Sequence, residues 1–344
     1  MRNILVIRLS SMGDVALTIP VLEALISQND NLKVSVLTRA VFNPLFCKLP
    51  VQLINPDLKA KHKGLIGLYR LSKEIKQKAS WEAVFDLHDV LRTKILRFLF
   101  KRMGIKVFAF DKGRAEKKKL TRKNNKVFKP LESTLERYAK AFRDYGLALS
   151  LDQAKPLTNS YKLSDRSRQI LGDQNKKKFG IAPFAKHRQK MYPLEKMENI
   201  IKEIASSEID VYLFGGGEEE KKQAERIVAE NDHVISVVGK FPLEEELALM
   251  EQMEVMLSMD SANMHLASLV GTKVFTIWGG THINAGFSPF LQGSDEQIIQ
   301  VPVEELPCRP CSVFGDKPCY RGDWACMNLI EEETVLSKLQ NYLH

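Results

Sequence analysis

Long apolar runs are missing from this sequence. No stretch of its 344 residues approaches the roughly 20 consecutive apolar residues that a membrane-spanning helix requires, so an integral helical membrane protein is not expected. The opening MRNILVIRLSSMGD contains a short apolar run, but Arg8 interrupts it and no small-residue cleavage site follows. This opening therefore predicts a buried strand rather than a signal peptide, and a cytoplasmic protein.

Two short motifs are also absent from the sequence, and cysteine is scarce. No Gly-x-Gly-x-x-Gly follows the first expected strand, residues 3–9, which argues against a nucleotide-dependent oxidoreductase. No Asp-x-Asp pair stands near the loops that could bind phosphate, so we expect no metal ion or other cofactor in catalysis. There are only five cysteines, and four of them fall between positions 308 and 326.

The rest of the composition, with 44% hydrophobic and 27% charged residues, is typical of a globular protein. The first half alternates short apolar runs with segments of helical periodicity. Strand and helix in this rhythm predict a parallel sheet with right-handed crossovers. The expected strands are 3–9, 33–38, 51–55, 83–88 and 106–110, and the expected helices are 15–28, 64–78 and 91–103.

A Pro- and Ser-containing stretch at 150–165 interrupts this rhythm, which then restarts. We therefore predict an α/β protein of two Rossmann-like domains, with parallel sheets facing a central cleft. The domains are 1–160 and 161–330, with a C-terminal helix at 331–344. The expected strands of the second half are 178–184, 210–216, 234–239, 255–259 and 274–280, and its helices are 193–206, 218–230, 243–253 and 262–270.

One segment of the chain is strongly basic. Positions 92–129 contain 15 Lys and Arg against 2 Asp and Glu, whereas the whole chain has a net charge of +9, so the remainder sums to −4. Such a segment suits an anionic substrate or membrane surface, or is simply a solvated loop. Its sequence AEKKKLTRKNNK lacks the interleaved aromatics of a single-strand binding surface, so no nucleic acid partner is expected.

Polar residues and glycines follow several expected strands, where ligands of parallel α/β sheets bind. Ser11, Gly13 and Asp14 follow the first strand and suit either a capped turn or an acceptor site. The loop PFAKHRQKMYP places four cations before a proline. The segment GGGEEE at 215–220 suits a helix dipole or the hydroxyls of a ribose.

The stretch SMDSANMHLASLVGT at 258–272 predicts a helix with Asp260, Ser261 and His265 in its first turns. Capping could explain the first two, and core packing could explain His265. The alternative is that the helix N–H groups and Ser261 bind a phosphate. Because this stretch, the cationic loop and two glycine-rich loops follow neighbouring strands, we interpret them as a nucleotide-diphosphate site, with capping as a by-product and Asp14 as a candidate base.

As a set, these residues resemble the ADP-heptose:lipopolysaccharide heptosyltransferase family, glycosyltransferase family 9, whose fold is GT-B. ILVIRLSSMGDVALTIPVLEAL is similar to the family's opening strand, loop and helix, and KMYP stands where the family has Lys before Trp-Pro. DSANMHLA is similar to its D-[ST]-G-x-x-H-L signature. Ala262 replaces the signature glycine, and Tyr192 replaces the tryptophan.

The resemblance implies an inverting transfer of heptose from an ADP-sugar donor, held by the second domain, to an acceptor held by the first. Asp14 would be the general base. The implied acceptor is an anionic lipid A or Kdo-type glycolipid, and membrane contact would be peripheral, at the inner membrane, through the Lys- and Arg-rich loop. Implied donor-binding residues are Lys190, Gly216, Glu219 (with Glu218 and Glu220 left open), Asp260, Ser261 and His265; implied acceptor-binding residues are Ser11, Gly13, Arg92 and the basic segment 94–129.

The clustered cysteines leave two interpretations open. Cys308 and Cys311 form a C-x2-C pair, whose spacing lets two thiolates bind one zinc ion, and Cys319 and Cys326 complete a set of four. Disulfides are disfavoured in a reducing cytoplasm, so the alternatives are a structural zinc and free thiols. The fifth cysteine, Cys47, is expected in the core.

Two further functions remain possible from the sequence. One is a GT-B transferase that uses another nucleotide sugar. The other is a catalytically silent homologue that binds an anionic glycan through the basic segment, although the presence of Asp14 and Lys190 argues against it.

Overall fold

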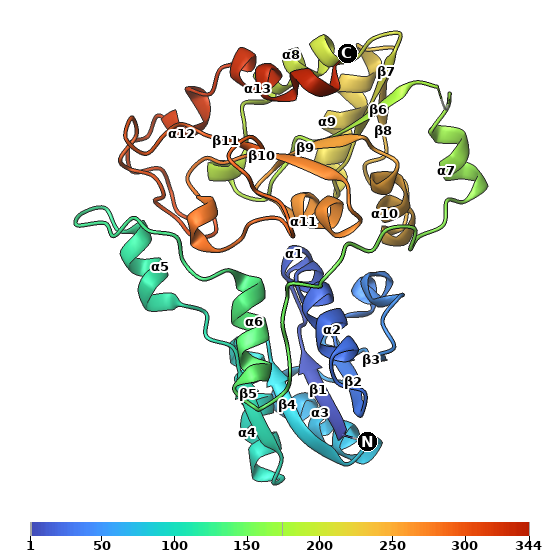
Figure 1. Ribbon diagram of the computed structural model, residues 1–344, viewed down its shortest axis with the longest axis vertical. Helices are drawn as coiled ribbons and strands as arrows, with labels where there is room; N and C mark the ends of the chain where they lie inside the picture. The colour runs from blue at the N-terminus through green and yellow to red at the C-terminus, as the bar shows by residue number, and fades with distance from the viewer. Residues whose placement is uncertain (1, 174, 344) are drawn as a thin grey trace. The chain divides into compact units, whose positions relative to one another are not determined.

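The computed structural model describes residues 2–173 and 175–343, and its chain divides into two compact units. The first unit comprises Met1–Gly113 and Ser133–Lys155, and the second comprises Arg114–Glu132 and Pro156–His344. Each unit is built on one parallel sheet with helices packed on it (Figure 1). Residues 114–132, which include the second half of the basic segment, therefore belong to the second unit.

The sheet of the first unit has the strand order β3-β2-β1-β4-β5, and all its pairs are parallel. The five strands expected from the sequence are all present. Its strands are β1 (Arg2–Ile7), β2 (Leu32–Leu37), β3 (Gln52–Ile54), β4 (Trp81–Asp86) and β5 (Lys106–Ala109); its helices are α1 (Met12–Ala16), α2 (Thr18–Ser27), the 3-10 helix η1 (Ala40–Phe46), α3 (Gly64–Lys78), α4 (Leu91–Arg102) and α6 (Thr134–Arg143).

The helix expected at 15–28 is wrong in one respect, because it is two helices that meet at Leu17. Pro20 stands in the first turn of α2 and has no N–H to donate to the carbonyl of Ala16. A continuous helix would lose that bond in its interior, so the chain starts a new helix there. The short α1 that results carries Asp14.

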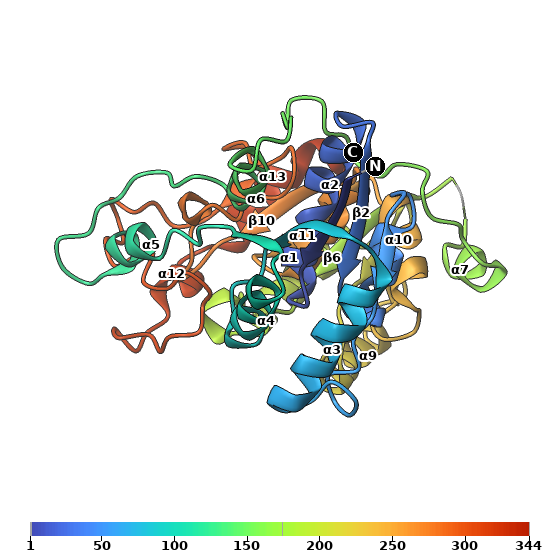
Figure 2. The same ribbon diagram turned by 90° about the horizontal axis from the view of Figure 1, so that it is seen from below.

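Apolar side chains fill both faces of this first sheet. Leu5 and Ile7 of β1 pack with Leu71 of α3 and Phe100 of α4 on one face. The helices α3 and α4 contact each other and lie side by side in Figure 2. The opposite face is covered by α2 and α6, where the ring of Phe85 lies 4.5 Å from that of Phe142.

The sheet of the second unit has the order β11-β10-β9-β6-β7-β8, again with parallel pairs. Its strands are β6 (Lys177–Ala182), β7 (Ile209–Leu213), β8 (Val234–Ser236), β9 (Val255–Met259), β10 (Lys273–Ile277) and β11 (Ile298–Ile299). Its helices are α5 (Arg114–Thr121), α7 (Asp165–Ile170), η2 (Arg188–Lys190), α8 (Leu194–Ile204), α9 (Glu218–Ala229), α10 (Leu243–Glu251), α11 (Ala262–Leu269), η3 (Ile283–Ala285), α12 (Ala325–Asn328), α13 (Glu332–Leu339) and η4 (Gln340–Tyr342).

The C-terminal segment packs back onto this second unit. The helix expected at 331–344 is α13 followed by η4, and its last position, His344, lies outside the described residues. Val335 and Leu339 of α13 are fully buried in the core that also contains Ile200 of α8. Among the helices described here, none has the length and apolar character needed to cross a bilayer.

The expectation for Cys47 is wrong. Its side chain is exposed at the end of η1, while Phe42, Leu45 and Phe46 of that helix are buried. A 3-10 helix has three residues per turn, so consecutive side chains point in different directions. Only some residues of a continuous apolar run can therefore face the core.

Candidate functional site

In the first unit, Asp14 is held at the carboxyl end of β1 by two donors. Ser11 precedes α1 as its N-cap, and its hydroxyl donates to Oδ2 of Asp14 at 2.7 Å. The guanidinium Nη2 of Arg8 lies 2.5 Å from the same oxygen. Arg8 is buried, with only 5% of its surface exposed, and its Nη1 donates to the carbonyl of Leu87. The Asp14 carboxylate is therefore oriented by two neighbouring side chains and still one-quarter exposed.

His88 is a candidate that the sequence analysis missed. It follows β4, the neighbour of β1, and its Nε2 lies 3.3 Å from the hydroxyl of Ser10. Burial and the nearby cations Arg8 and Lys112 lower the pKa of His88 to about 3, so the imidazole is neutral at physiological pH. Within the described part of the chain its Nδ1 has no hydrogen-bond partner. The signal was the polar run DLHD at the end of an expected strand.

The carboxyl end of β4 also orders the start of α4. Asp86 is fully buried, and its Oδ1 accepts from the backbone N–H groups of His88 and Asp89. Arg97 pairs with Asp89 at 2.9 Å and with Asp86 at 3.3 Å. Arg92, predicted to meet the acceptor, is exposed on the first turn of α4. Ser11, Gly13, Asp14 and Arg92 therefore all lie at the carboxyl edge of β1 and β4.

In the second unit, Lys190 and Asp260 form an ion pair. The ammonium of Lys190, in the cationic loop after β6, lies 2.8 Å from Oδ2 of Asp260, which directly follows β9. Their side chains are 16% and 6% exposed, so the pair is largely removed from water. The strands β6 and β9 are adjacent in the sheet, which brings together residues 70 positions apart.

The helix α11 begins beside this ion pair without a side-chain cap. Ser261 occupies the N-cap position, but its hydroxyl makes no capping hydrogen bond and lies 3.4 Å from that of Ser258. The expectation that Asp260 or Ser261 caps this helix is therefore wrong, because Asp260 turns to Lys190 instead. His265, one turn further, is buried. An uncapped helix start next to a lysine is a favourable setting for a phosphate.

Two glycines after β10 allow the cationic loop to pack closely. A Cβ atom on Gly279 or Gly280 would lie 2.5 Å from atoms of Gln189, and the N–H of Gly280 donates to the carbonyl of Gln189. The amide Nε2 of Gln189 and the hydroxyl of Thr281 are buried, and neither has a partner among the described residues. The sequence analysis gave neither residue a role, although both stand in loops that follow expected strands.

The glycine-rich loop after β7 is closed by a carboxylate. Glu220 accepts a hydrogen bond from the N–H of Gly216 at 2.8 Å, and burial raises its pKa. Glu219, the residue predicted for ribose recognition, is exposed and contacts Gln223 on its own helix. Glu220, which the sequence analysis left open, is thus the carboxylate nearest the glycines.

Comparison with known proteins establishes the family to which these two units belong. The family model described as "Glycosyltransferase family 9 (heptosyltransferase)" matches residues 68–315, well over half of the chain. The chain belongs to glycosyltransferase family 9. It is therefore a glycosyltransferase of the heptosyltransferase family, as the resemblance implied.

Relatives of this glycosyltransferase match along its whole length. Lipopolysaccharide heptosyltransferase 1 of Campylobacter coli is 24% identical, with 97% of both chains covered. The structure of the family 9 enzyme of Veillonella parvula has a TM-score of 0.77 at 18% identity, covering 99% of this chain and 97% of that one. E. coli heptosyltransferase WaaC with ADP-2-deoxy-2-fluoro heptose has a TM-score of 0.66 at 17% identity and 99% coverage of both. The predicted GT-B fold of two parallel sheets is confirmed.

A more distant structure with the same fold is TibC of E. coli, described as an iron-containing dodecameric heptosyltransferase in complex with ADP-D-beta-D-heptose. Its TM-score is 0.58 at 12% identity, with 100% of this chain and 77% of that chain covered.

The four clustered cysteines of this family 9 enzyme line one small cavity. Cys308, Cys311, Cys319 and Cys326 surround a space of about 10 Å³, room for one water-sized particle. All four are free thiols, and within residues 2–173 and 175–343 no three of their sulfurs lie within 4.8 Å of one another. Burial raises the pKa of Cys326 to about 12.

Two cations lie against this cysteine cluster with carbonyl partners. The ammonium of Lys126 lies within hydrogen-bond distance, 2.7 to 3.1 Å, of four successive carbonyl oxygens, those of residues 307–310. Arg309 is 1% exposed and donates to the carbonyls of Trp278, Gly279, Thr281 and Val301 and to the side chain of Gln300. Burial lowers the pKa of Arg309 to about 10. Neither cation has a carboxylate partner among the described residues.

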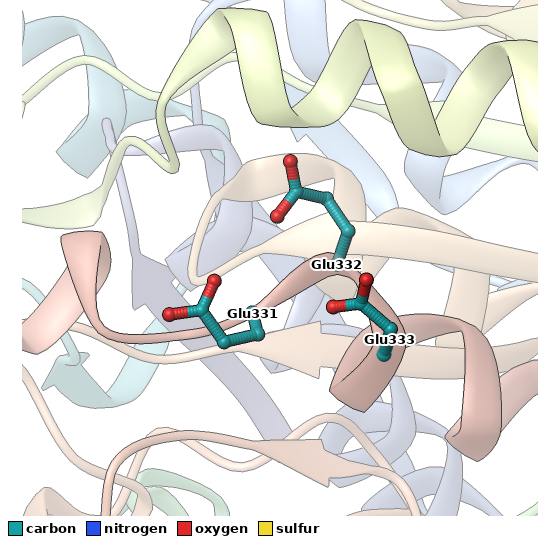
Figure 3. Close-up of side chains that lie close together, drawn as sticks. All are labelled: Glu331, Glu332 and Glu333. Carbon is teal, nitrogen blue, oxygen red and sulfur yellow. The ribbon is translucent and has the colours of Figure 1, made fainter.

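Three glutamates at the start of α13 form an acidic cluster, and two of them already share a cation. Glu331 and Glu332 lie 2.7 Å and 3.6 Å from the ammonium of Lys196, and Figure 3 shows Glu332 pointing toward α8. Acidic residues at a helix start interact favourably with its dipole. This cluster, with Glu333, is therefore explained by the helix and by Lys196 of α8.

Proposed function

We propose that this family 9 enzyme transfers heptose from ADP-heptose to an anionic lipopolysaccharide inner-core acceptor, with inversion at the anomeric carbon. The observation that carries the proposal is the Lys190–Asp260 pair beside the uncapped start of α11. That arrangement offers a cation, a hydroxyl and the N–H groups of the first helical turn to a diphosphate. The Campylobacter coli relative and the donor analogue bound to WaaC support lipopolysaccharide and ADP-heptose as substrates.

The proposed reaction is a single displacement. The acceptor hydroxyl oxygen bonds to the anomeric carbon as the bond from that carbon to the β-phosphate oxygen breaks, and the bonding electron pair leaves with ADP. Negative charge grows on the diphosphate, so Lys190, Ser261 and the α11 N–H groups stabilise the transition state more than the ground state. In this scheme Glu220 and Gly216 contact the ribose, and Thr281 and Gln189 donate further hydrogen bonds.

Asp14 takes the proton of the acceptor hydroxyl in this scheme. Arg8 and Ser11 both contact Oδ2, so the carboxylate has one orientation. The proton becomes acidic only as the oxygen bonds to carbon, so a carboxylate suffices as base. The neutral His88 and exposed Arg92 at the same edge supply a hydrogen bond and a positive charge for the acceptor.

Calorimetric titration with ADP, GDP and UDP tests the proposal. We expect ADP to bind selectively and the Lys190→Ala/Ser261→Ala variant to lose that binding. Selective binding of GDP or UDP would assign another nucleotide sugar. The absence of any nucleotide binding would contradict the transferase function and favour a glycan-binding homologue.

We further propose that Cys308, Cys311, Cys319 and Cys326 hold one structural metal ion. Four thiolates around a divalent ion carry a net charge of −2, and Lys126 and Arg309 supply two positive charges that have no carboxylate partner nearby. Four-thiolate sites bind zinc or iron. Zinc is the ion expected from the C-x2-C spacing, and the iron in TibC makes iron the alternative.

Elemental analysis of the purified protein tests the metal site. We expect about one zinc or iron per chain, and less than half of it in Cys308→Ser and Cys326→Ser. Cys47→Ser, which changes the exposed cysteine, is the matched control and should retain the metal. A metal-free wild-type protein with four thiols that titrate freely would refute the site.

A further inference from the structure

The outward faces of α3 and α4 carry large apolar side chains in contact with solvent. Ile66 of α3 is 79% exposed and Leu91 of α4 is 77% exposed, and Leu65, Tyr69 and Phe98 are each more than half exposed. These two helices contact each other in the first unit (Figure 2). Five large exposed apolar residues on one helix pair are unusual for a surface in contact only with water.

A groove runs between these two helices. Leu65 of α3 and Lys94, Ile95, Phe98 and Leu99 of α4 line it, and its volume is about 440 Å³. Four of the five lining residues are apolar, and the fifth is a lysine.

The surroundings of the groove are strongly basic. Residues 61–78 contain six Lys and Arg and one acid, Glu74, which pairs with Lys61 at 2.8 Å. Residues 91–106 contain six Lys and Arg and no acid. Positive side chains thus flank the apolar ones on both helices.

We propose that the α3–α4 face docks onto the surface of an anionic phospholipid bilayer. Apolar side chains at an interface enter the boundary between headgroups and acyl chains, while flanking lysines and arginines stay with the phosphates. Each basic residue near an anionic bilayer contributes about 1 kcal/mol of attraction. The α3–α4 face has both components.

Other occupants fit this face less well. A second copy of the chain would bring one basic face against another, which charge repulsion opposes. A nucleic acid would use the cations but leave Leu65, Ile66 and Leu91 without a partner, because recognition of a phosphate backbone does not require aliphatic side chains.

The position of the face suits a membrane-held acceptor. In a parallel sheet with right-handed crossovers, a helix starts at the carboxyl edge of the strand before it. Ile66 and Leu91 lie in the first turns of α3 and α4, at the edge where Asp14 lies. This part of the inference rests on the proposed function, since a face beside Asp14 would help catalysis only if the acceptor is held in a membrane.

The Lys- and Arg-rich loop is a weaker candidate for this contact. Lys117 lies 4.3 Å from the ring centre of Phe287, Lys123 lies 5.2 Å from that of Tyr320, and Lys126 is bonded to the cysteine loop. These lysines hold the loop to its own unit. The loop's large apolar residues Val127 and Phe128 are only 39% and 41% exposed, and Phe128 packs edge-on against His282.

Co-sedimentation with vesicles tests the docking face. The probes are vesicles of phosphatidylglycerol with phosphatidylcholine and vesicles of phosphatidylcholine alone, on the full-length protein. We expect binding to the anionic vesicles that weakens as salt is added. Ile66→Ser/Phe98→Ser and Lys73→Glu/Lys94→Glu should each weaken that binding by about tenfold or more.

Matched variants isolate the face. Leu291→Ser/Leu329→Ser removes two exposed leucines of the second unit, and Lys118→Glu/Lys119→Glu reverses two exposed lysines of α5; both should bind vesicles like the wild type. Unchanged binding by the two α3–α4 variants would overturn the proposal. Loss confined to the α5 variant would move the contact to the loop, and preferential binding of polyuridine RNA would make the face a nucleic acid surface.

Asp14→Asn separates this inference from the proposed function. The variant should bind vesicles like the wild type, since Asp14 is not on the face, while losing transfer. Vesicle binding by the wild type without any heptose transfer would refute the function and leave the docking face standing. Heptose transfer to a detergent-dispersed acceptor without any vesicle binding would support the proposed function and refute the docking face.

Discussion

The guanidinium of Arg8, the residue directly after β1, lies 2.5 Å from the carboxylate of Asp14 in α1. Arg8 is buried, and its Nη1 donates to the carbonyl of Leu87 beyond β4. The pair therefore ties the loop after β1 to the loop after β4, the two loops that hold the candidate acceptor residues.

Asp14→Asn should abolish most transfer without affecting the donor. The amide keeps the shape of the carboxylate but cannot accept a proton, so kcat should fall by about 10²–10⁴-fold. Initial rates of ADP release measure this, and calorimetry with ADP should give an unchanged Kd. Ser11→Ala is the control, because it removes an orienting hydrogen bond and leaves the base. A parallel fall in ADP affinity would mean that Asp14 is structural.

Lys190 and Asp260 should show strong coupling in a double-mutant cycle. Lys190→Met leaves the buried Asp260 carboxylate without its cation and should cost about 3–5 kcal/mol of unfolding free energy. Lys190→Met/Asp260→Asn removes both charges and should cost less than the single change. Urea unfolding of the wild type, the two single variants and the double variant measures the coupling free energy. Additive effects would show that the ion pair at 2.8 Å contributes nothing to stability.

Gly315→Ala should weaken donor binding although it touches no reacting group. Gly315 has φ +75°, and a Cβ there would lie 2.8 Å from the Lys190 side chain. Gly322→Ala is the matched control, because Gly322 has φ +82° and open space around its Cβ position. Both should lose about 1–2 kcal/mol of stability from the left-handed backbone, but only Gly315→Ala should raise the Kd for ADP. Equal Kd values for the two variants would show that the close approach of Gly315 to Lys190 does not affect ADP binding.

His88 should make the unfolding free energy depend on pH. Its pKa is about 3 in the folded protein against an ordinary 6.5, so between these values the unfolded chain binds more protons than the folded one. Stability should therefore rise with pH from about 3 to about 6.5 and be lost on acidification. His88→Gln should flatten this slope in urea unfolding when it is compared with the wild type. A slope that survives His88→Gln belongs to other groups, such as His282.

Much of the fold could be predicted from local patterns. Short apolar runs such as the one at 3–9 marked the strands, and amphipathic runs such as the one at 64–78 marked helices. These patterns are readable because burial repeats with the period of the element. The break at Leu17 was not predicted, although Pro20 was visible, because a proline in a first helical turn and one that ends a helix look alike without the neighbouring bonds.

The candidate site was predictable only as residue types at strand ends. Asp14, Lys190, Asp260 and Ser261 were marked by their places after expected strands. Their partners were not predictable. Asp260 could cap α11 or pair with Lys190, and the sequence does not show which of these two contacts the side chain makes. His88 and Gln189 were given no role for the same reason.

The sequence by itself determined the order of strands and helices along the chain, the family and the positions of the polar loops, since all of these depend on residues close in sequence. Only the tertiary structure decided that Lys190 meets Asp260, that Arg8 meets Asp14, that four cysteines share one cavity and that α3 and α4 leave an apolar, basic face exposed. Those relationships depend on sheet order and loop conformation, which place residues far apart in sequence next to each other through the summed packing of the whole unit.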